Sequence, residues 1–448
     1  MLEYQAWIRL SQDMEVEWQQ AMDEGRAVED FRTICETIQK NQESLQYEEL
    51  ASAVRRQMDA APQREDYPFD EPSALEEIRA ARPAARHTVS GTLPEETLRN
   101  AVRGAWLGRI AGCLLGKPVE GWHTPELHAL LKKTGNYPLH RYIESKDFTP
   151  ELIEEFKLNV DNCWADRVHG RAPIDDDTNY TVLGLKLVET YGVNFRPNDV
   201  LEAWLFWLPY FAVCTAERAA YRNATMGLRA PQTATENNPY REWIGAQIRA
   251  DFFGYLNVGN PRAAAEMAWR DASISHVKNG IYGEMWVAAM LAAAPYCSDP
   301  AQLIEIGLDE LPQKCRLREK VEQVLAWYRA GQDADAIMAG IHAAFDEFTG
   351  HGWCHTISNA MIVAMGLLCG AGDYGKAICL AVQCGFDTDC NGATVGSIMG
   401  MMHGAQAIPA VWTAPFSEGL STSISGNNCV DIDELVERTL AAIAKLSE

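Results

Sequence analysis

The sequence lacks three features that would each indicate a particular class of protein. Its 12 cysteines form no CxxC pair and no Cys/His cluster at zinc spacing, which argues against a zinc site and favours buried free thiols in a reducing compartment. Its longest uncharged stretch, residues 390–417, contains Asn, Gln, His and two prolines, a poor composition for a membrane span. The N-terminus has neither a basic start nor an apolar run, so we expect no signal peptide and a cytoplasmic protein.

Positive charge is also scarce. The 448 residues include 39 Lys and Arg against 62 Asp and Glu, which gives a formal net charge of −23. Such a chain repels phosphate backbones and anionic membrane surfaces, so we expect neither nucleic acid nor membrane among its partners. A small-molecule ligand, a protein substrate and a homo-oligomer all remain compatible with this charge.

Helical periodicity dominates what is present, and alternating β-branched runs are rare. Near the N-terminus, apolar side chains such as Trp7, Met14 and Trp18 recur at helical spacing, and two turn-rich segments with prolines follow. Alanine-rich amphipathic segments then continue to the C-terminus and predict ten or more helices. We therefore predict an all-α protein, with a helical N-terminal appendage and linker of unknown role (residues 1–90) and a compact multi-helix domain (residues 91–448).

Two segments of the predicted domain carry glycine at every fourth position. Residues at this spacing share one side of a helix, so each helix presents a bare stripe that lets another backbone approach closely. Each interior glycine costs about 1 kcal/mol relative to alanine, which only such an approach would offset. We expect the stripes to form a tight helix crossing rather than a ligand contact. The glycines are Gly104, Gly108, Gly112 and Gly116 in the first segment and Gly392, Gly396, Gly400 and Gly404 in the second.

Clustered aspartates stand just before two apolar-periodic segments, at predicted helix N-termini. They are Asp175, Asp176 and Asp177 in "PIDDDTNYTVLG", and Asp387 and Asp389 in "GFDTDCNGATVG". Helix capping, worth about 1 kcal/mol per residue, explains one or two of these acids. It explains three adjacent acids poorly, because their charges repel one another.

A divalent cation would compensate these acids. No lysine or arginine lies between Gly385 and Ser417, so the second pair has no cation nearby in the sequence. Hard oxygen ligands from aspartates, with the hydroxyls of Thr178 and Thr388, suit Mg²⁺ or Mn²⁺ better than zinc. Five carboxylates carry enough charge for two ions.

Three motifs, in order, resemble the ADP-ribosylglycohydrolase family: "GRIAGCLLGKPVEG", "DDDTNYT" and "GFDTDCNGATVGSIMGMMHG". The resemblance covers about residues 95–440 and implies an all-α fold with a binuclear Mg²⁺ or Mn²⁺ centre at the base of a cleft. It implies metal ligands at Asp176 and Asp177 and at Asp387 and Asp389, with Asp389 bridging the ions. It also places an acidic residue, Glu120, beside the metals.

The sequence departs from the family pattern at two positions. Asp175 stands where many members have Thr or Ser, which adds a negative charge to the first metal site and makes Asp175 a further candidate ligand. Cys390 stands where a hydroxyl often ligates the second metal, and a thiol suits Mg²⁺ poorly.

Four further residues are candidate substrate contacts. By the resemblance, His276 in "DASISHVKNG" faces the cleft, and His355 follows the loop "TGHGW"; the alternative for each is a core histidine. Gly245 and Arg249 in "EWIGAQIRAD" are candidates for a pocket wall, with a buried ion pair as the alternative for Arg249.

Two metals held by acids, without a Cys-His or Ser-His pair, suit metal-assisted hydrolysis. The resemblance implies that ribose hydroxyls bind the metals and that an N- or O-glycosidic bond of an ADP-ribosylated protein or a small ribosyl compound is cleaved. Glu120, Asp175 and Asp387 are the candidate acid/base residues. One alternative is a non-catalytic protein that binds ADP-ribose or another ribosyl ligand. Another is a Mg²⁺-dependent prenyl-diphosphate enzyme, although "FDTDCNGATVG" does not supply the second acidic motif which that chemistry needs.

Overall fold

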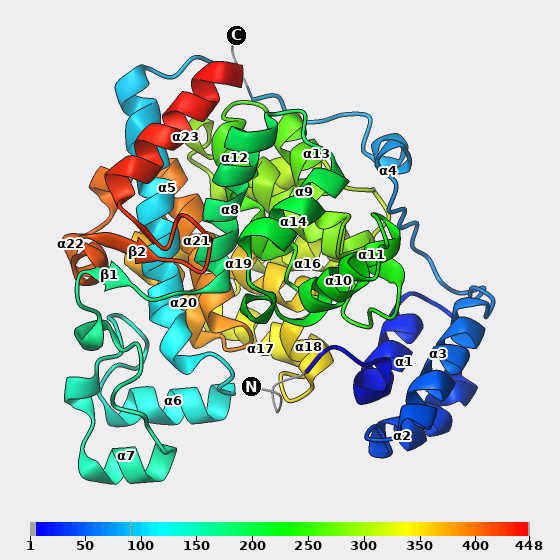
Figure 1. Ribbon diagram of the computed structural model, residues 1–448. Coiled ribbons are helices and arrows are strands. Elements are labelled where there is room, and N and C mark those ends of the chain that lie inside the picture. The colour runs from blue at the N-terminus through cyan, green and yellow to red at the C-terminus, as the bar shows by residue number, and fades with distance from the viewer. Residues whose placement is uncertain (1–5, 90, 447–448) are drawn as a thin grey trace.

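The computed structural model describes residues 6–89 and 91–446, and α-helices dominate it (Figure 1). Within this part of the chain there are 23 α-helices and three strands of two or three residues each. The predicted all-α class is confirmed. The predicted boundary at residue 90 falls on a residue outside the described part, and the division into two domains stays a prediction.

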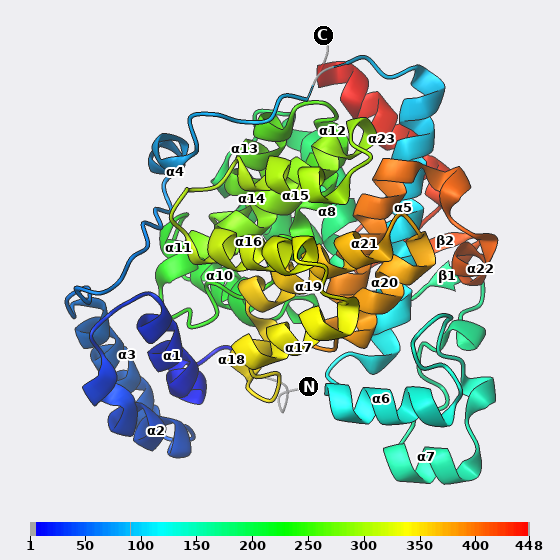
Figure 2. The ribbon, with the colours of Figure 1, turned by 180° about the vertical axis from the view of Figure 1, so that it is seen from behind.

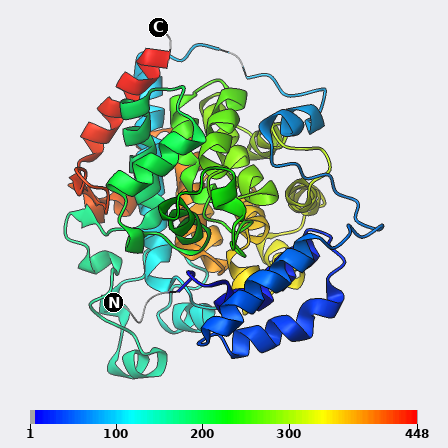
Figure 3. The same cartoon turned by 45° about the vertical axis from the view of Figure 1, so that its right-hand side comes forward.

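The first three helices, α1 (Met14–Asp23), α2 (Arg32–Lys40) and α3 (Leu45–Asp59), pack around a small hydrophobic core of their own. They lie together at one side of the larger body in Figures 1 and 3, and we call them the appendage. A linker that includes α4 (Leu75–Ala81) then runs along the body towards the next long helix. The appendage core consists of Leu10, Met14, Ala21, Val28, Cys35, Ile38, Ala51, Val54 and Met58.

Buried ion pairs join the appendage to the body. The guanidinium of Arg241 lies 2.8 Å from Glu17 Oε2 and 2.7 Å from Glu24 Oε1, both on or next to α1. Lys278 Nζ lies 2.8 Å from Glu24 Oε2. Gln20 on the same helix donates to Glu242 of the body at 2.8 Å. These groups are largely withdrawn from solvent, so each depends on its partner across the seam.

The linker is held in the same way. Arg316 Nη2 lies 2.8 Å from Glu71 Oε2 of the linker and 2.7 Å from Glu242 Oε2 of the body. Asn279 Nδ2 also donates to Glu71 Oε1, at 2.8 Å. We call the contacts of both the appendage and the linker with the body the appendage seam.

Helix α14 (Lys278–Ala293) lies in the centre of the body and is buried along almost its whole length. A helix that is apolar on every side belongs in a core, and other helices surround this one (Figure 2). The other helices of the body are α8 (Asp176–Tyr191), α9 (Pro197–Trp207), α10 (Thr215–Thr225), α11 (Gln232–Thr235), α12 (Asp251–Leu256), α13 (Pro261–Ala272), α15 (Pro300–Leu308), α16 (Arg316–Arg329), α17 (Ala334–Ala344), α18 (Gly350–Cys354), α19 (Thr356–Gly370) and α20 (Tyr374–Gln383).

The two glycine stripes meet. They lie on α5 (Glu95–Gly116) and α21 (Thr388–His403), which pack antiparallel against each other. A Cβ atom on Gly112 would lie 1.9 Å from the carbonyl oxygen of Gly392, and one on Gly108 would lie 2.1 Å from that of Gly396. The backbones therefore touch, and the expected tight helix crossing is confirmed. We call this contact the glycine junction.

Peripheral elements complete the fold. Helices α6 and α7 extend away from the body (Figure 1), while α23 packs beside α5, where Trp106 Nε1 donates to Thr439 Oγ1 at 3.1 Å. A small sheet has the order β1-β2-β3, with β1 parallel and β3 antiparallel to β2. The bounds are α6 (Thr124–Lys133), α7 (Pro150–Phe156), α22 (Ala410–Thr413), α23 (Ile432–Leu446), β1 (Arg171–Ala172), β2 (Gly419–Ser421) and β3 (Cys429–Val430).

All 12 cysteines are free thiols, as expected. Most are buried or half-buried, but Cys429 is exposed, so the expectation of burial is wrong for that residue. In the described residues, no helix combines the length and the apolar character needed to cross a membrane.

Candidate functional site

The glycine junction brings Glu120 close to the second aspartate motif, Asp387 and Asp389. At the end of α5, a Cβ atom on Gly116 would lie 2.3 Å from the carbonyl group of Thr388, and the Thr388 hydroxyl donates to Gly116 O at 3.0 Å. One further turn of chain then leads to Glu120, which is exposed. Carboxylate oxygens of Glu120, Asp387 and Asp389 lie within 4.8 Å of one another.

The first aspartate motif joins the same site. Carboxylate oxygens of Asp175, Asp176 and Asp177 lie within 4.8 Å of one another, and Asp177 also lies within this distance of Asp389 and Cys390. All the acids predicted from the sequence are therefore brought together around the end of α5 and the N-termini of α8 and α21. The positive ends of two helix dipoles favour negative charge at this place.

Asp175 is the N-cap of α8. Its Oδ1 accepts a hydrogen bond from the backbone N–H of Asp177 at 2.8 Å, and its backbone oxygen accepts one from the Thr178 hydroxyl at 3.2 Å. The acid therefore has the capping role that any helix start would give it. Capping accounts for one oxygen of one acid in the cluster of three.

A sharp reversal of the chain presents Asp387 at the start of α21. Gly385 and Phe386 both have positive φ, 76° and 57°. Phenylalanine rarely adopts this conformation, and here its fully buried ring holds it in place. Asp387 follows as the N-cap residue, with its backbone N–H donating to Asn359 Oδ1 at 3.3 Å.

Two cations that the sequence analysis missed compensate part of the acidic charge. Arg109 Nη2 lies 2.9 Å from Asp177 Oδ1, and Lys117 Nζ lies 2.6 Å from Asp175 Oδ2. No lysine or arginine lies between Gly385 and Ser417 in the sequence, and these two cations come instead from α5 and the turn after it. Both cations lie within the first glycine motif, and this position was the sign in the sequence that they would lie near the acids.

Compensation is incomplete, because two buried carboxylate oxygens have no hydrogen-bond partner. They are Asp177 Oδ2 and Asp389 Oδ1, on side chains that are at most 1% exposed. An unpartnered buried carboxylate is costly, and hard oxygen donors of this kind are the ligands that Mg²⁺ and Mn²⁺ prefer. The residues present therefore fit a divalent metal ion.

The crowding of acids raises their pKa values. Burial, with the charges of Asp175 and Asp389, raises the pKa of Asp176 to about 8. Burial and Asp175 raise the pKa of Asp389 to about 6. The charge of Asp389 raises the pKa of Glu120 well above its usual value. Without a metal ion, these carboxyl groups keep their protons to higher pH than free carboxyl groups do.

Cys390 faces the same cluster as a neutral thiol. Burial and the acids around it raise the pKa of this thiol well above its usual value. A protonated thiol is a poor ligand for a hard cation. Its oxygen-donating neighbours, Asp177 and Asp389, are the better ligands there.

Arg249 and Gly245 belong to a buried ion-pair network. Arg249 is 1% exposed, its Nη1 lies 2.7 Å from Glu217 Oε1, and its Nε donates to Asp271. A Cβ atom on Gly245 would lie 1.9 Å from Glu217 Oε1, so this glycine makes room for the Glu217 carboxylate. The geometry matches the ion-pair alternative for Arg249.

His276 is also buried, at 1% exposure, and its Nδ1 lies 2.8 Å from Ser275 Oγ. Burial lowers its pKa well below the usual value, so the ring is neutral. This environment matches the core-histidine alternative.

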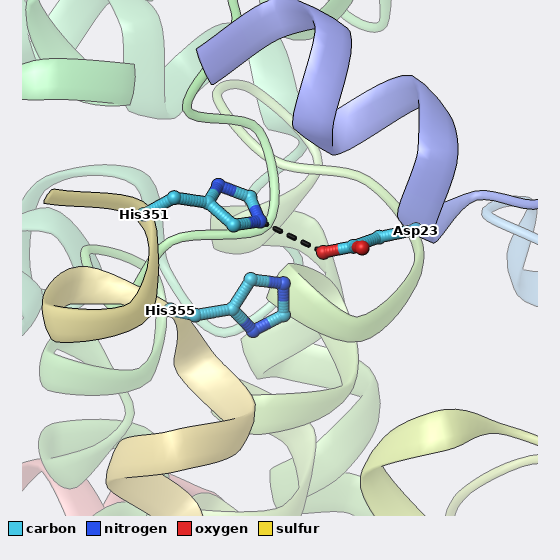
Figure 4. A group of neighbouring side chains, drawn as sticks. All are labelled: Asp23, His351 and His355. Carbon is cyan, nitrogen blue, oxygen red and sulfur yellow. Dashed lines mark hydrogen bonds and ion pairs between the residues drawn. The ribbon is translucent and has the colours of Figure 1, made fainter. Parts of the chain in front are cut away.

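His355 lies near the appendage seam, with His351 and Asp23 (Figure 4). His351 Nε2 lies 2.8 Å from Asp23 Oδ2 of α1, and Trp243 Nε1 donates to His351 Nδ1 at 3.1 Å. The N–H of Ile357 donates to His355 Nδ1, also at 3.1 Å.

Both Nδ1 atoms in this group accept hydrogen bonds from fixed donors. In a neutral imidazole the proton therefore resides on Nε2, where a metal ligand would need a lone pair. The Asp23–His351 pair is thus a hydrogen-bonded link between appendage and body rather than part of a second metal site. His355 lies beside this pair, with its Nε2 3.7 Å from Glu242 Oε2 of the body.

Comparison with known proteins identifies the family. A solved structure described as an "ADP-ribosylglycohydrolase-related protein complex" is 20% identical, with a TM-score of 0.51, and the match covers 79% of this chain and 100% of that chain; it supports the fold alone. None of the curated proteins compared with the chain matches it. A family model described as ADP-ribosylglycohydrolase matches residues 94–447. The predicted resemblance is confirmed: the chain belongs to the ADP-ribosylglycohydrolase family of hydrolases, which act on glycosyl bonds and are typically metal-dependent.

Proposed function

We propose that the protein is a metal-dependent hydrolase that cleaves an N- or O-glycosidic bond of an ADP-ribosyl or related ribosyl compound. The observation that carries the proposal is the meeting of six carboxylates from three chain segments, two of which retain buried, unpartnered oxygens. Unpartnered buried carboxylate oxygens also occur at Glu284 in the Arg249 network, and what distinguishes these two is their place within a cluster of six acids. The unpartnered oxygens, Asp177 Oδ2 and Asp389 Oδ1, favour a metal cation as part of the functional site.

The residues that would hold Mg²⁺ or Mn²⁺ are Asp176 and Asp177 on one side and Asp387 and Asp389 on the other. The two groups of acids suit two ions, with Asp389 between them because it lies close to both Asp177 and Asp387. When bound, such ions would orient adjacent ribose hydroxyls and so position the anomeric carbon for attack by water.

Glu120 is the best candidate for the acid/base residue. It is exposed at the rim of the cluster, whereas Asp175 and Asp387 are buried. A carboxyl group at the rim can contact a bound substrate and exchange protons with solvent, as an acid/base residue must. Asp175 is less suited to this role because both of its oxygens already accept hydrogen bonds.

The test is release of ADP-ribose from ADP-ribosylated proteins, measured after metal removal and again after Mg²⁺ or Mn²⁺ is restored. The proposal predicts release only with metal, and a loss of about 100-fold or more in Glu120→Gln. Metal-dependent binding of ADP-ribose without release from any ribosyl compound would favour the non-catalytic alternative. Release that persists without metal would contradict the proposal.

A further inference from the structure

Lys117 differs from the other cations near the site because it is partly exposed and yet bound to a buried acid. Its side chain is 22% exposed, and its Nζ lies 2.6 Å from Asp175 Oδ2, whereas the Asp175 side chain is 0% exposed. The lysine follows directly after α5, so the glycine junction that positions Glu120 positions it as well. The contact is therefore built into the same turn that completes the acidic site.

The two oxygens of Asp175 are both in use. Oδ1 accepts from the backbone N–H of Asp177 and Oδ2 accepts from Lys117. Asp177 and Asp389, in contrast, each retain an oxygen without a partner. Both Asp175 oxygens therefore already have partners within the protein, unlike Asp177 Oδ2 and Asp389 Oδ1.

We propose that Lys117 is a positioning residue that keeps Asp175 out of the metal ligand set. The ion pair is neutral as a unit, so the third acid adds no net charge to the site, and a divalent ion meets the charge of the remaining acids only. Asp175 serves as a helix cap, and Lys117 prevents its carboxylate from turning towards the metal. This inference rests on the proposed function, because it concerns the ligands of that same site.

Calorimetric titration of the metal-free protein with Mn²⁺ tests this role in four chains: wild type, Lys117→Met, Asp175→Asn and the double variant. Removal of the lysine frees the Asp175 carboxylate and its charge, so Lys117→Met should bind Mn²⁺ at least about tenfold more tightly. Asp175→Asn keeps a good N-cap but leaves the lysine charge unpaired, so it should bind more weakly. The double variant has the net charge of the wild type and should bind within about threefold of it.

A Lys117→Arg variant is the matched control and should bind like the wild type, because it preserves the charge opposite Asp175. Thermal melts of each metal-free variant establish that it is folded. Loss of about tenfold or more in the double variant would show that Asp175 is a metal ligand and would overturn the inference, as would unchanged affinity in Lys117→Met. Absence of Mn²⁺ binding by all the chains would instead overturn the proposed function, and the inference with it.

Discussion

The glycine junction and the appendage seam both join segments that are far apart in the sequence, but they do so by opposite means. At the glycine junction, α5 and α21 touch backbone to backbone, with no side chain between Gly112 and Gly392. At the appendage seam, long charged side chains span the gap, as between Arg241 and Glu17. One contact depends on the absence of side chains and the other depends on their charges.

This difference explains where the candidate site lies. Side chains have rotamers and can adjust, whereas touching backbones fix the relative position of two helices closely. Asp389 stands at the start of α21 and Glu120 follows one turn after the end of α5, so the glycine junction sets their separation. The appendage seam holds a peripheral unit in place and has no acid of the site within its network.

Arg241→Leu should break the seam and give the largest loss of stability. The change leaves Glu17 and Glu24 buried without their shared partner, and disruption of a buried ion pair costs about 3–5 kcal/mol. Arg99→Leu is the control, because its pair with Glu437 is exposed to solvent and contributes little to stability. Urea unfolding measures both, and equal effects would contradict the assigned importance of the seam.

Gly112→Ala should lower the stability of the protein by disturbing the glycine junction, with a smaller effect than Arg241→Leu has at the appendage seam. The new methyl group would lie 1.9 Å from Gly392 O, so the helices must separate, at a cost of about 1–3 kcal/mol. Gly350→Ala is the control, since a methyl group there would meet only Trp243 Cη2, at 3.7 Å.

Gly112→Ala and Arg241→Leu should also differ in metal affinity. Gly112→Ala displaces the acids and should weaken Mn²⁺ binding, while folded Arg241→Leu should bind Mn²⁺ like the wild type. Weakened binding in Arg241→Leu, or unchanged binding in Gly112→Ala, would remove the distinction between the two contacts.

A smaller effect is the dependence of the stability of the metal-free protein on pH. The pKa values of Asp176 and Asp389, about 8 and about 6, lie above the ordinary aspartate value of 3.8, so the folded metal-free protein binds protons more tightly than the unfolded chain. The stability that these groups contribute is complete below about pH 4 and is lost as the pH rises towards 8.

Melting of the metal-free protein at pH 5.5 and pH 8.5 measures this effect. The difference in melting temperature between these two pH values should be smaller in an Asp176→Asn, Asp389→Asn double variant, because its amides do not titrate. Excess Mg²⁺ should also reduce the difference in the wild type. An identical pH dependence in wild type and double variant would contradict the assigned pKa shifts.

Backbone-driven features were predictable from the sequence, whereas most charge networks were not; the buried ion pair offered as the alternative for Arg249 is the exception. The spacing of glycines such as Gly108 and Gly396 indicated the helix crossing, and the two aspartate motifs were expected at helix N-termini, as observed. Periodic patterns report local structure directly, which is why these features could be read before any fold was known.

The appendage seam could not be anticipated in the same way. Glu17 and Arg241 are 224 positions apart, and nothing local distinguishes a buried charge from a solvated one. The same limitation concealed Lys117 as the partner of Asp175, because the pair forms only when α5 and α8 pack together. Sequence patterns predicted the acids that the fold brings together at the candidate site, while their compensation depended on the tertiary fold.

The most direct test of the central claim is a calorimetric titration of metal-free wild type and Asp389→Asn with Mg²⁺ and Mn²⁺, followed by ADP-ribose. Asp389 lies between the two groups of acids and retains an unpartnered oxygen, so its amide variant should lose metal binding by about 100-fold or more. The account predicts that the wild type binds metal and then binds ADP-ribose in a metal-dependent way. Equal metal binding by the two chains, or no metal binding by the wild type, would contradict it.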